Sequence, residues 1–252
     1  MGIETITSRS NPLMSHIRKL TSSGAYRRKT GAFVCDGRKL LSEAQQWHIP
    51  MSAVVFCDGE TPPEAPGARL VQVSRELMAY IAPSDTPQGV LAVCTMAEMP
   101  LPEALMGRRY LLLDGVQDPG NVGTILRTAD AFDCDGMFLV GACANLYNPK
   151  TVRATMGALF RRPVWRCAPA QAKGLLSTAG IPLLGAALRS DTRDVRQVDY
   201  TRAAVAIGSE GRGLSEEVLA LCDQTVRIPM SERCESLNAA VAASVLLWEM
   251  YR

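Results

Sequence analysis

The feature that most constrains the fold is a set of short, wholly apolar runs that each end at a polar residue or a glycine. Tyr110-Leu-Leu-Leu113 ends at Asp114, and Ala203-Ala-Val-Ala-Ile207 ends at Gly208. Apolar and polar residues do not alternate within these runs, so each strand is expected to be buried on both faces. The second half of the chain is therefore predicted to be an α/β domain whose parallel sheet is covered by helices on both sides.

Helical spacing and further apolar runs continue this pattern. A helix is expected after the loop that follows Asp114, with apolar residues at 122, 125, 126, 129 and 132. The other expected strands of this half lie at 136–140, 181–187, 203–207 and 226–228, and the other expected helices lie at 148–159 and 236–251. In the last helix, one apolar stripe is formed by Leu237, Val241, Val245 and Trp248.

The first hundred residues are predicted to form a smaller α/β unit. Strands are expected at 32–35, 53–56, 70–73 and 89–93, and helices at 11–20 and 38–47. Two prolines in Met99-Pro-Leu-Pro102 and the glycine at 107 indicate a break in the chain. The predicted domains are residues 1–98 and 109–252, joined by a linker at 99–108.

Charge alone does not predict a nucleic-acid partner, because 27 Lys and Arg residues against 25 Asp and Glu residues leave a net charge of +2. Residues 1–50, however, include eight basic residues and only three acidic ones. A local basic patch of this kind can hold a phosphate backbone. The alternative is an ordinary solvated face. The residues expected to contact RNA are Arg9, Arg27, Arg28, Lys29, Arg38 and Lys39. The candidates for contacts with bases are Tyr26, Phe33 and Tyr80, with core packing as the alternative.

The cysteines and histidines do not predict a metal site. None of the eight cysteines forms a C-x-x-C pair, and the chain has only two histidines. Neither a signal peptide nor an apolar run of membrane length is apparent. Scattered cysteines without a secretory signal favour a reducing, cytoplasmic location, with most of them acting as small buried apolar residues.

Three polar segments follow the ends of predicted buried strands, at the edge where open α/β sheets bind ligands. The first places Gly120 and Asn121 at a helix start, where backbone N–H groups attract an anion. On that helix Arg127 lies about 140° from Val122, off the apolar stripe. The alternative interpretation is an N-cap asparagine and a solvent-facing arginine.

The second segment is the glycine-rich loop Ile207-Gly-Ser-Glu-Gly-Arg-Gly213. Glycines at 208, 211 and 213 allow a sharp turn and a close approach to a ligand, and Glu210 is the only carboxylate in the loop. The loop lacks the lysine of a phosphate-binding P-loop and the glycine spacing of a dinucleotide-binding turn. The alternative is a tight turn with no ligand.

The third segment runs from Arg227 through Ile228-Pro-Met230 to Ser236-Leu-Asn238. Ser236 is suited to cap the final helix, which would be a purely structural role. Asn238 would then lie one turn inside the helix, where asparagine is a poor helix former. A functional role is therefore favoured for Asn238.

The three segments carry three motifs in a fixed order: N-x-G-x-x-x-R, then I-G-S-E-G-x-G, then I-P-M followed by S-L-N. Together these motifs resemble those of the SpoU (TrmH-type) family of RNA ribose 2′-O-methyltransferases, in the SPOUT class. The resemblance covers residues 108–252. The stretch from Phe33 to Ala44 is similar to the family's substrate-binding domain of the ribosomal-protein-L30e type. The resemblance implies methyl transfer from S-adenosylmethionine, a trefoil knot and a homodimer. It also implies an RNA substrate, with 23S ribosomal RNA expected before tRNA.

The resemblance also assigns roles to the matching positions. The residues implied in catalysis are Asn121, Arg127, Glu210, Ser236 and Asn238. The residues implied in holding the methyl donor, largely through backbone contacts, are Gly208, Ile228 and Leu237, together with their neighbours Gly211, Gly213, Pro229 and Met230.

The residues leave the mechanism and the function class partly open. No histidine lies in the second half, and arginine is an unusual base because it stays protonated. Arg127 therefore acts either as the proton acceptor or as a fork that grips a phosphate and orients the hydroxyl. The alternatives to an RNA methyltransferase are a non-catalytic RNA-binding or ribosome-assembly factor, and a small-molecule enzyme with a nucleotide at the glycine loop. The missing P-loop lysine counts against the last of these.

Overall fold

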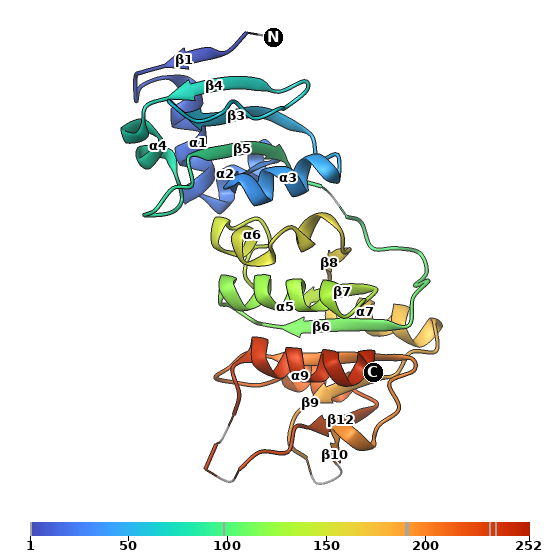
Figure 1. The fold of residues 1–252 in the computed structure, drawn as a ribbon. Helices are drawn as coiled ribbons and strands as arrows, with labels where there is room; N and C mark the ends of the chain where they lie inside the picture. Colours follow the sequence, from blue (N-terminus) through green and yellow to red (C-terminus); the bar gives the residue numbers. More distant parts are fainter. Residues whose placement is uncertain (1, 98, 190–191, 232, 235) are drawn as a thin grey trace. The chain divides into compact units, whose positions relative to one another are not determined.

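The chain forms two compact units in a computed structural model (Figure 1). The residues that it describes are 2–97, 99–189, 192–231, 233–234 and 236–252. Unit 1 consists of Met1–Glu98 and Asn145–Phe160, and unit 2 consists of Met99–Ala144 and Arg161–Arg252. A segment from the middle of the chain thus packs with the N-terminal residues.

Unit 1 is built on a five-stranded sheet in the order β1-β4-β3-β5-β2, in which β5 is antiparallel to both of its neighbours. The strands are β1 (Glu4–Ile6), β2 (Ala32–Asp36), β3 (Met51–Cys57), β4 (Arg69–Val73) and β5 (Val90–Thr95). The helices are α1 (Pro12–Ser22), α2 (Gly24–Thr30), α3 (Arg38–Gln46), α4 (Arg75–Ile81) and α6 (Pro149–Thr155), followed by the 3-10 turn η1 (Ala158–Phe160).

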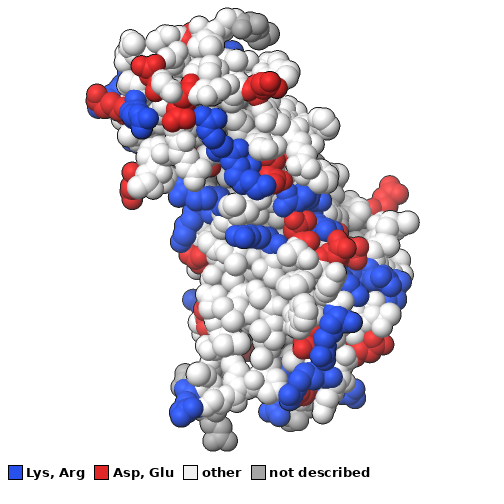
Figure 2. Space-filling view, in the orientation of Figure 1, with Lys and Arg blue, Asp and Glu red and all other residues white. Residues whose placement is uncertain are grey.

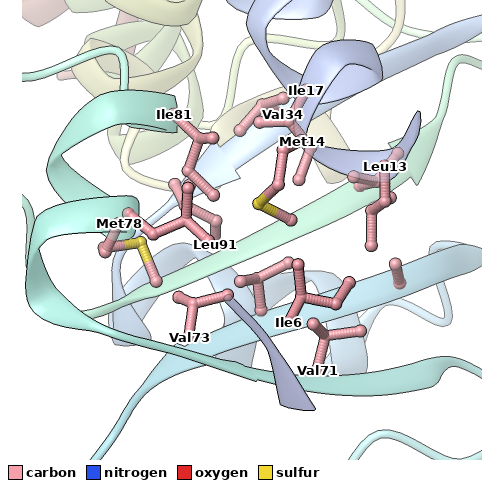
Figure 3. Packing of buried hydrophobic residues seen from close by; sticks show 14 of the residues in the cluster. Ile6, Leu13, Met14, Ile17, Val34, Val71, Val73, Met78, Ile81 and Leu91 are labelled. Carbon is pink, nitrogen blue, oxygen red and sulfur yellow. The ribbon is translucent and has the colours of Figure 1, made fainter. Parts of the chain in front are cut away.

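One face of this sheet is covered by α1 and α4. Met14 and Ile17 from α1, with Met78 and Ile81 from α4, point toward the strands and are buried (Figure 3). Burying side chains of this size contributes about 1.5–3 kcal/mol each. The apolar spacing of the two helices therefore fixes which of their faces meets the sheet.

The opposite face of β2 carries Phe33, which is 1% exposed. Its ring lies 4.8 Å from the ring of Tyr147 and 6.4 Å from that of Phe160, measured between centroids. The Tyr147 hydroxyl donates a hydrogen bond of 2.8 Å to the carbonyl of Ala97. Phe33 therefore belongs to the core, and the expectation that it could contact RNA bases is wrong.

The predicted strands and helices of the first hundred residues are confirmed, while β1, α2 and α4 were not predicted. The helix expected at 148–159 ends at Thr155 instead. Met156 has a left-handed backbone with φ of 50°, and Gly157 follows with φ of 93°. Two successive residues with positive φ stop the helix, because a right-handed helix needs negative φ.

Unit 2 is built on a seven-stranded sheet in the order β10-β12-β9-β11-β6-β7-β8, and its strand pairs are parallel, as predicted. The strands are β6 (Arg109–Asp114), β7 (Gly136–Val140), β8 (Val164–Arg166), β9 (Leu183–Ala186), β10 (Arg193–Asp194), β11 (Ala203–Gly208) and β12 (Gln224–Arg227). The helices are α5 (Pro119–Ala131), α7 (Pro169–Thr178), α8 (Glu216–Leu221) and α9 (Ala239–Tyr251), with the 3-10 turn η2 (Val195–Gln197).

Helices α5 and α9 pack against each other on one face of the sheet, and buried residues of α7 and α8 belong to the apolar cluster on its other face. Within the described ranges, no helix is both long and apolar enough to cross a lipid bilayer. The double covering accounts for the unbroken apolar runs of β6 and β11, since neither face of these strands meets water.

The final helix begins at Ala239, three residues later than predicted. Asn238 is its N-cap, and its side-chain oxygen accepts hydrogen bonds from the N–H groups of Ala240 and Val241. Asn238 thus does not sit inside the helix, and Ser236 does not cap it. The predicted apolar stripe is also not the buried one, because Val241 and Trp248 are half exposed whereas Leu246 is fully buried.

Candidate active site

The carboxyl ends of β6 and β11 lie side by side, with Gly208 paired to Asp114. After β6 the chain turns into α5, where Asp118 is the N-cap and its side chain accepts a hydrogen bond of 2.8 Å from the N–H of Asn121. Asn121 is thus the third residue of the helix and not its cap. Its side-chain amide remains available for other partners.

Asn121 is the centre of a hydrogen-bonded trio with Glu210 and Asn238. The Nδ2 of Asn121 donates to the Oε1 of Glu210, and the Nδ2 of Asn238 donates to the Oδ1 of Asn121 at 3.2 Å. Asn121 is half-buried, whereas Glu210 and Asn238 are exposed. The three polar segments found in the sequence therefore converge at one edge of the parallel sheet, with one residue from each.

The glycine loop presents Glu210 at the tip of a tight turn. The N–H of Ser209 donates to the carbonyl of Gly213 at 3.1 Å, and the reverse bond is 2.9 Å. A Cβ on Gly208 would come within 2.0 Å of the Gly213 carbonyl carbon, and Gly213 has φ of 67°. These two glycines are therefore required by the turn itself, whereas a Cβ on Gly211 would meet open space.

Asp114 fixes the base of this loop, although the sequence did not single it out as a site residue. It is 8% exposed, and its Oδ2 accepts a hydrogen bond of 2.7 Å from the N–H of Ser215. The Ser215 side chain in turn caps α8. This hydrogen bond holds the end of the glycine loop to β6, the strand next to β11. The available signal was a carboxylate placed directly after a buried strand.

An apolar cavity lies at the carboxyl ends of β9 and β12. It is lined by Ala186, Ala187, Leu188, Val226, Arg227, Ile228, Met230, Leu237, Ala242 and Leu246. Three of the residues predicted to hold the methyl donor, Ile228, Met230 and Leu237, are in this lining. Leu237 immediately precedes Asn238, so the cavity and the trio share one loop. The apolar lining residues Leu188, which is exposed, and Leu246, which is fully buried, were missed, because a single apolar side chain carries no recognisable sequence signal of a site.

The other predicted site residues lie outside the cavity and the trio. Gly208, Gly211 and Gly213 belong to the turn that holds Glu210, and Pro229 is not in the cavity lining. Ser236 is exposed in the loop before Leu237.

Arg127 is exposed on α5, about 9 Å along the helix axis from Asn121 and roughly 120° around it. In the part of the chain that the structure describes, the Arg127 side chain makes neither a hydrogen bond nor an ion pair. It is therefore not joined to the trio within its own chain.

A buried thiol lies close to Asp114. Cys143 Sγ donates hydrogen bonds of 3.2 Å to the carbonyls of Leu113 and Val140. Burial raises the pKa of the Cys143 thiol. The thiol is consequently protonated near neutral pH and serves as a packing residue, not as a nucleophile.

The basic residues predicted to contact RNA fall into three groups in unit 1. Arg27 is only 4% exposed, and its Nη1 donates to the carbonyl of Leu20 at 2.7 Å, so this guanidinium is not on the surface as the sequence suggested. Arg28 and Lys29 are exposed. The remaining ones are paired with carboxylates, as Arg9 with Glu76, Arg38 with Glu60 at 2.7 Å, and Lys39 with Glu43 at 2.6 Å. Basic and acidic side chains are accordingly interspersed on the visible face (Figure 2).

Solved structures share this fold along nearly the whole chain. An S-adenosylmethionine-bound rRNA methyltransferase from Sinorhizobium meliloti is 31% identical, with coverage of 98% of this chain and 97% of that one and a TM-score of 0.88. The SpoU methyltransferase AviRb from Streptomyces viridochromogenes, also solved with S-adenosylmethionine, is 29% identical, with 96% and 97% coverage and a TM-score of 0.84. The fold is therefore that of the SPOUT class of methyltransferases.

The sequence matches are of the same kind. The 23S rRNA (guanosine(2553)-2′-O)-methyltransferase RlmP of Bacillus subtilis is 32% identical over 89% of this chain and 90% of its own. Residues 11–92 match the profile of the MRM3-like substrate binding domain. Residues 108–248 match that of the SpoU rRNA Methylase family, and the chain belongs to this family of RNA 2′-O-methyltransferases.

Proposed function

We propose that this protein transfers the methyl group of S-adenosylmethionine to a ribose 2′-hydroxyl in 23S ribosomal RNA. The observation that carries the proposal is the trio of Asn121, Glu210 and Asn238 beside an apolar cavity, at the carboxyl edge of a parallel sheet. Such an edge is where open α/β sheets bind ligands.

The cavity fits the methyl donor in chemical character. Its walls are apolar side chains such as Ile228, Met230 and Leu246, which suit an adenine ring. When bound, S-adenosylmethionine supplies an activated methyl group on a sulfonium, so the protein has to hold the two reactants in line.

We assign the polar side chains to the acceptor. The Glu210 carboxylate, fixed by the amide of Asn121, accepts a hydrogen bond from a ribose hydroxyl placed at the trio. The exposed guanidinium of Arg127 binds an RNA phosphate and orients that hydroxyl. Ser236 lies in the loop directly before Leu237 and contributes a further hydroxyl to the acceptor side.

Ribosomal RNA is favoured over tRNA as the substrate because relatives named for rRNA cover a larger share of this chain. The relative from Streptomyces viridochromogenes named as a 23S rRNA (uridine(2479)-2′-O)-methyltransferase covers 98% of this chain. The solved structure of the TrmH/SpoU tRNA modifying enzyme from A. aeolicus covers 57% of this chain, with a TM-score of 0.51. The N-terminal unit is therefore best explained as the part that selects the larger RNA, as a substrate-binding domain spanning residues 1–98.

Three further features are part of the proposal. A homodimer is supported by the uncharged surface over α5 and α9, where Val241, Trp248 and Tyr251 are about half exposed (Figure 2). A trefoil knot is supported by the return of α9 to pack on β11 and α5 after the chain has formed β12. A cytoplasmic location follows from a ribosomal substrate and agrees with cysteines that are free, not disulfide-bonded.

Mapping of 2′-O-methylation across total RNA, with and without the gene, tests the reaction and its substrate. We expect one site in 23S rRNA to be lost and to be restored by purified protein with S-adenosylmethionine. Loss of a tRNA site would support the tRNA alternative instead. No lost site, together with a calorimetric titration that detects no binding of S-adenosylmethionine, would identify a non-catalytic RNA-binding factor.

A further inference from the structure

Two arginines in unit 1 lie over the same aromatic ring. The guanidinium carbon of Arg9, in the loop before α1, is 4.9 Å from the ring centroid of Tyr80, and that of Arg18, on α1, is 4.7 Å from it. Tyr80 lies on α4 and is half-buried, with its ring packed against the core of the unit. The ring is therefore a fixed platform, whereas the two arginines are exposed.

Further bonds restrain both guanidinium groups. Arg18 Nη1 donates to the backbone carbonyl of Tyr80 at 3.0 Å, and Arg9 Nη2 donates to Oε1 of Glu76. A guanidinium stacked on a ring directs its N–H groups outward in the plane of the stack, where they suit the oxygens of a phosphate. Stacking and bonding thus orient the two forks before any ligand arrives, which lowers the entropy cost of binding.

Among the described residues, only one of the two arginines over Tyr80 forms an ion pair with a carboxylate. For comparison, Arg38 pairs with Glu60, which also lies 3.9 Å from Arg75, and Lys39 pairs with Glu43, whose side chain is largely buried. The carboxylate that pairs with Arg9 is Glu76, whose side chain is 80% exposed. An exposed pair of this kind is weak, so a phosphate can replace Glu76 at little cost.

We propose that Arg9, Arg18 and Tyr80 form a phosphate clamp for the RNA backbone. The proposal rests on the proposed RNA substrate. Arg18 and Arg9 each bind a backbone phosphate through their outward N–H groups, and Tyr80 holds the guanidinium groups in place. The clamp positions RNA and does not read its sequence, because phosphates are common to all nucleotides.

The test uses the full-length protein and 23S rRNA transcript, with binding measured over a range of salt concentrations. We expect Arg9→Gln and Arg18→Gln each to weaken binding about 3- to 10-fold and to lower the salt-dependence slope by about 0.9. Tyr80→Leu should weaken binding without changing the slope, since it loosens the clamp but removes no charge. The matched control is Arg69→Gln, an exposed arginine of the same unit that is paired with Glu4 at 2.7 Å.

The outcomes separate this inference from the proposed function. Double variants at Arg9 and Arg18 that bind RNA with the wild-type affinity and slope would overturn the clamp, as would a wild-type protein that binds no RNA. If the Arg9 and Arg18 variants lose no more RNA affinity than Arg69→Gln, the cluster contributes only general surface charge. That result would also overturn the clamp. A wild-type protein that binds 23S rRNA with the expected slopes but never methylates it would overturn the proposed function and leave the clamp standing.

Discussion

Units 1 and 2 both cover a sheet with helices, but they distribute their polar side chains in opposite ways. Unit 2 gathers Asn121, Glu210 and Asn238 at one edge of a parallel sheet, beside the buried and mainly apolar strands β6 and β11. Unit 1 spreads basic residues over its surface and pairs several of them with carboxylates. Chemistry that needs particular residues at one place leaves motifs in a sequence, whereas a surface that needs only charge does not.

The largest expected effect concerns residues 145–160, the segment from the middle of the chain that belongs to unit 1. Phe33→Ala removes the ring between Tyr147 and Phe160, and loss of a buried phenylalanine costs about 3–5 kcal/mol of unfolding free energy. Urea unfolding should show this loss, and limited proteolysis should cut within residues 145–160. Tyr147→Phe is the milder control, because it removes only the hydroxyl bonded to Ala97. An unchanged urea midpoint for Phe33→Ala would show that unit 1 does not depend on this segment.

The next effect concerns Arg127, on which the acceptor side of unit 2 is proposed to depend. Arg127→Ala should lower the rate of methyl transfer about 100-fold or more. Binding of S-adenosylmethionine, measured by calorimetry, should stay within about twofold, because Arg127 is not in the cavity lining. Arg108→Ala, at the amino end of β6 and also exposed, should leave the rate unchanged. A near wild-type rate for Arg127→Ala would remove it from the catalytic residues.

The Asn238 side chain has two roles that can be tested separately, as the cap of α9 and as the hydrogen-bond donor to Asn121. Asn238→Ala removes the cap of α9 and should cost about 0.5–2 kcal/mol of stability as well as activity. Asn238→Asp keeps a good capping oxygen but loses the amide donor to Asn121, so thermal stability should be near wild type while methyl transfer falls. Equal activity of Asn238→Asp and the wild type would show that Asn238 is only a cap.

The smallest effect concerns an ion pair between an exposed arginine and a buried carboxylate, which joins the middle segment to β2. Arg153 Nη2 lies 2.8 Å from Oδ2 of Asp36, whose side chain is 6% exposed. Burial raises the pKa of Asp36, although Arg153 opposes this. A carboxyl with a raised pKa takes up a proton more readily when folded, so its contribution to stability is present at low pH and is lost as pH rises through the folded pKa.

Asp36→Asn should therefore change the unfolding free energy by less than about 1 kcal/mol at pH 7, since the burial cost and the ion pair offset each other. Relative to Asp36→Asn, the wild type should gain stability as the pH falls toward the pKa of the carboxyl. Urea titrations of both proteins between neutral and mildly acidic pH measure this difference. A large loss at pH 7 would show that the ion pair outweighs the burial cost.

The sequence anticipated much of the fold where local rules were sufficient. The cap at Asn11 and the proline at 12 set the start of α1, and the unbroken apolar runs gave the parallel sheet of unit 2. It misplaced the start of α9, because Ser236 and Asn238 are both good capping residues and only the path of the chain decides between them. It also counted Arg27 as a surface charge, since nothing in a run of three basic residues tells which one turns inward.

By itself the sequence determined the residue types at the site, the order of the three motifs and the strands that carry them, because these follow from local spacing and apolar pattern. The tertiary structure alone decided which distant side chains meet. Asn121 bonds Glu210 and Asn238 across 89 and 117 residues, and the segment at 145–160 packs on unit 1. Contacts of this range depend on how whole elements pack, and burial of apolar surface sets that packing without leaving a local signal.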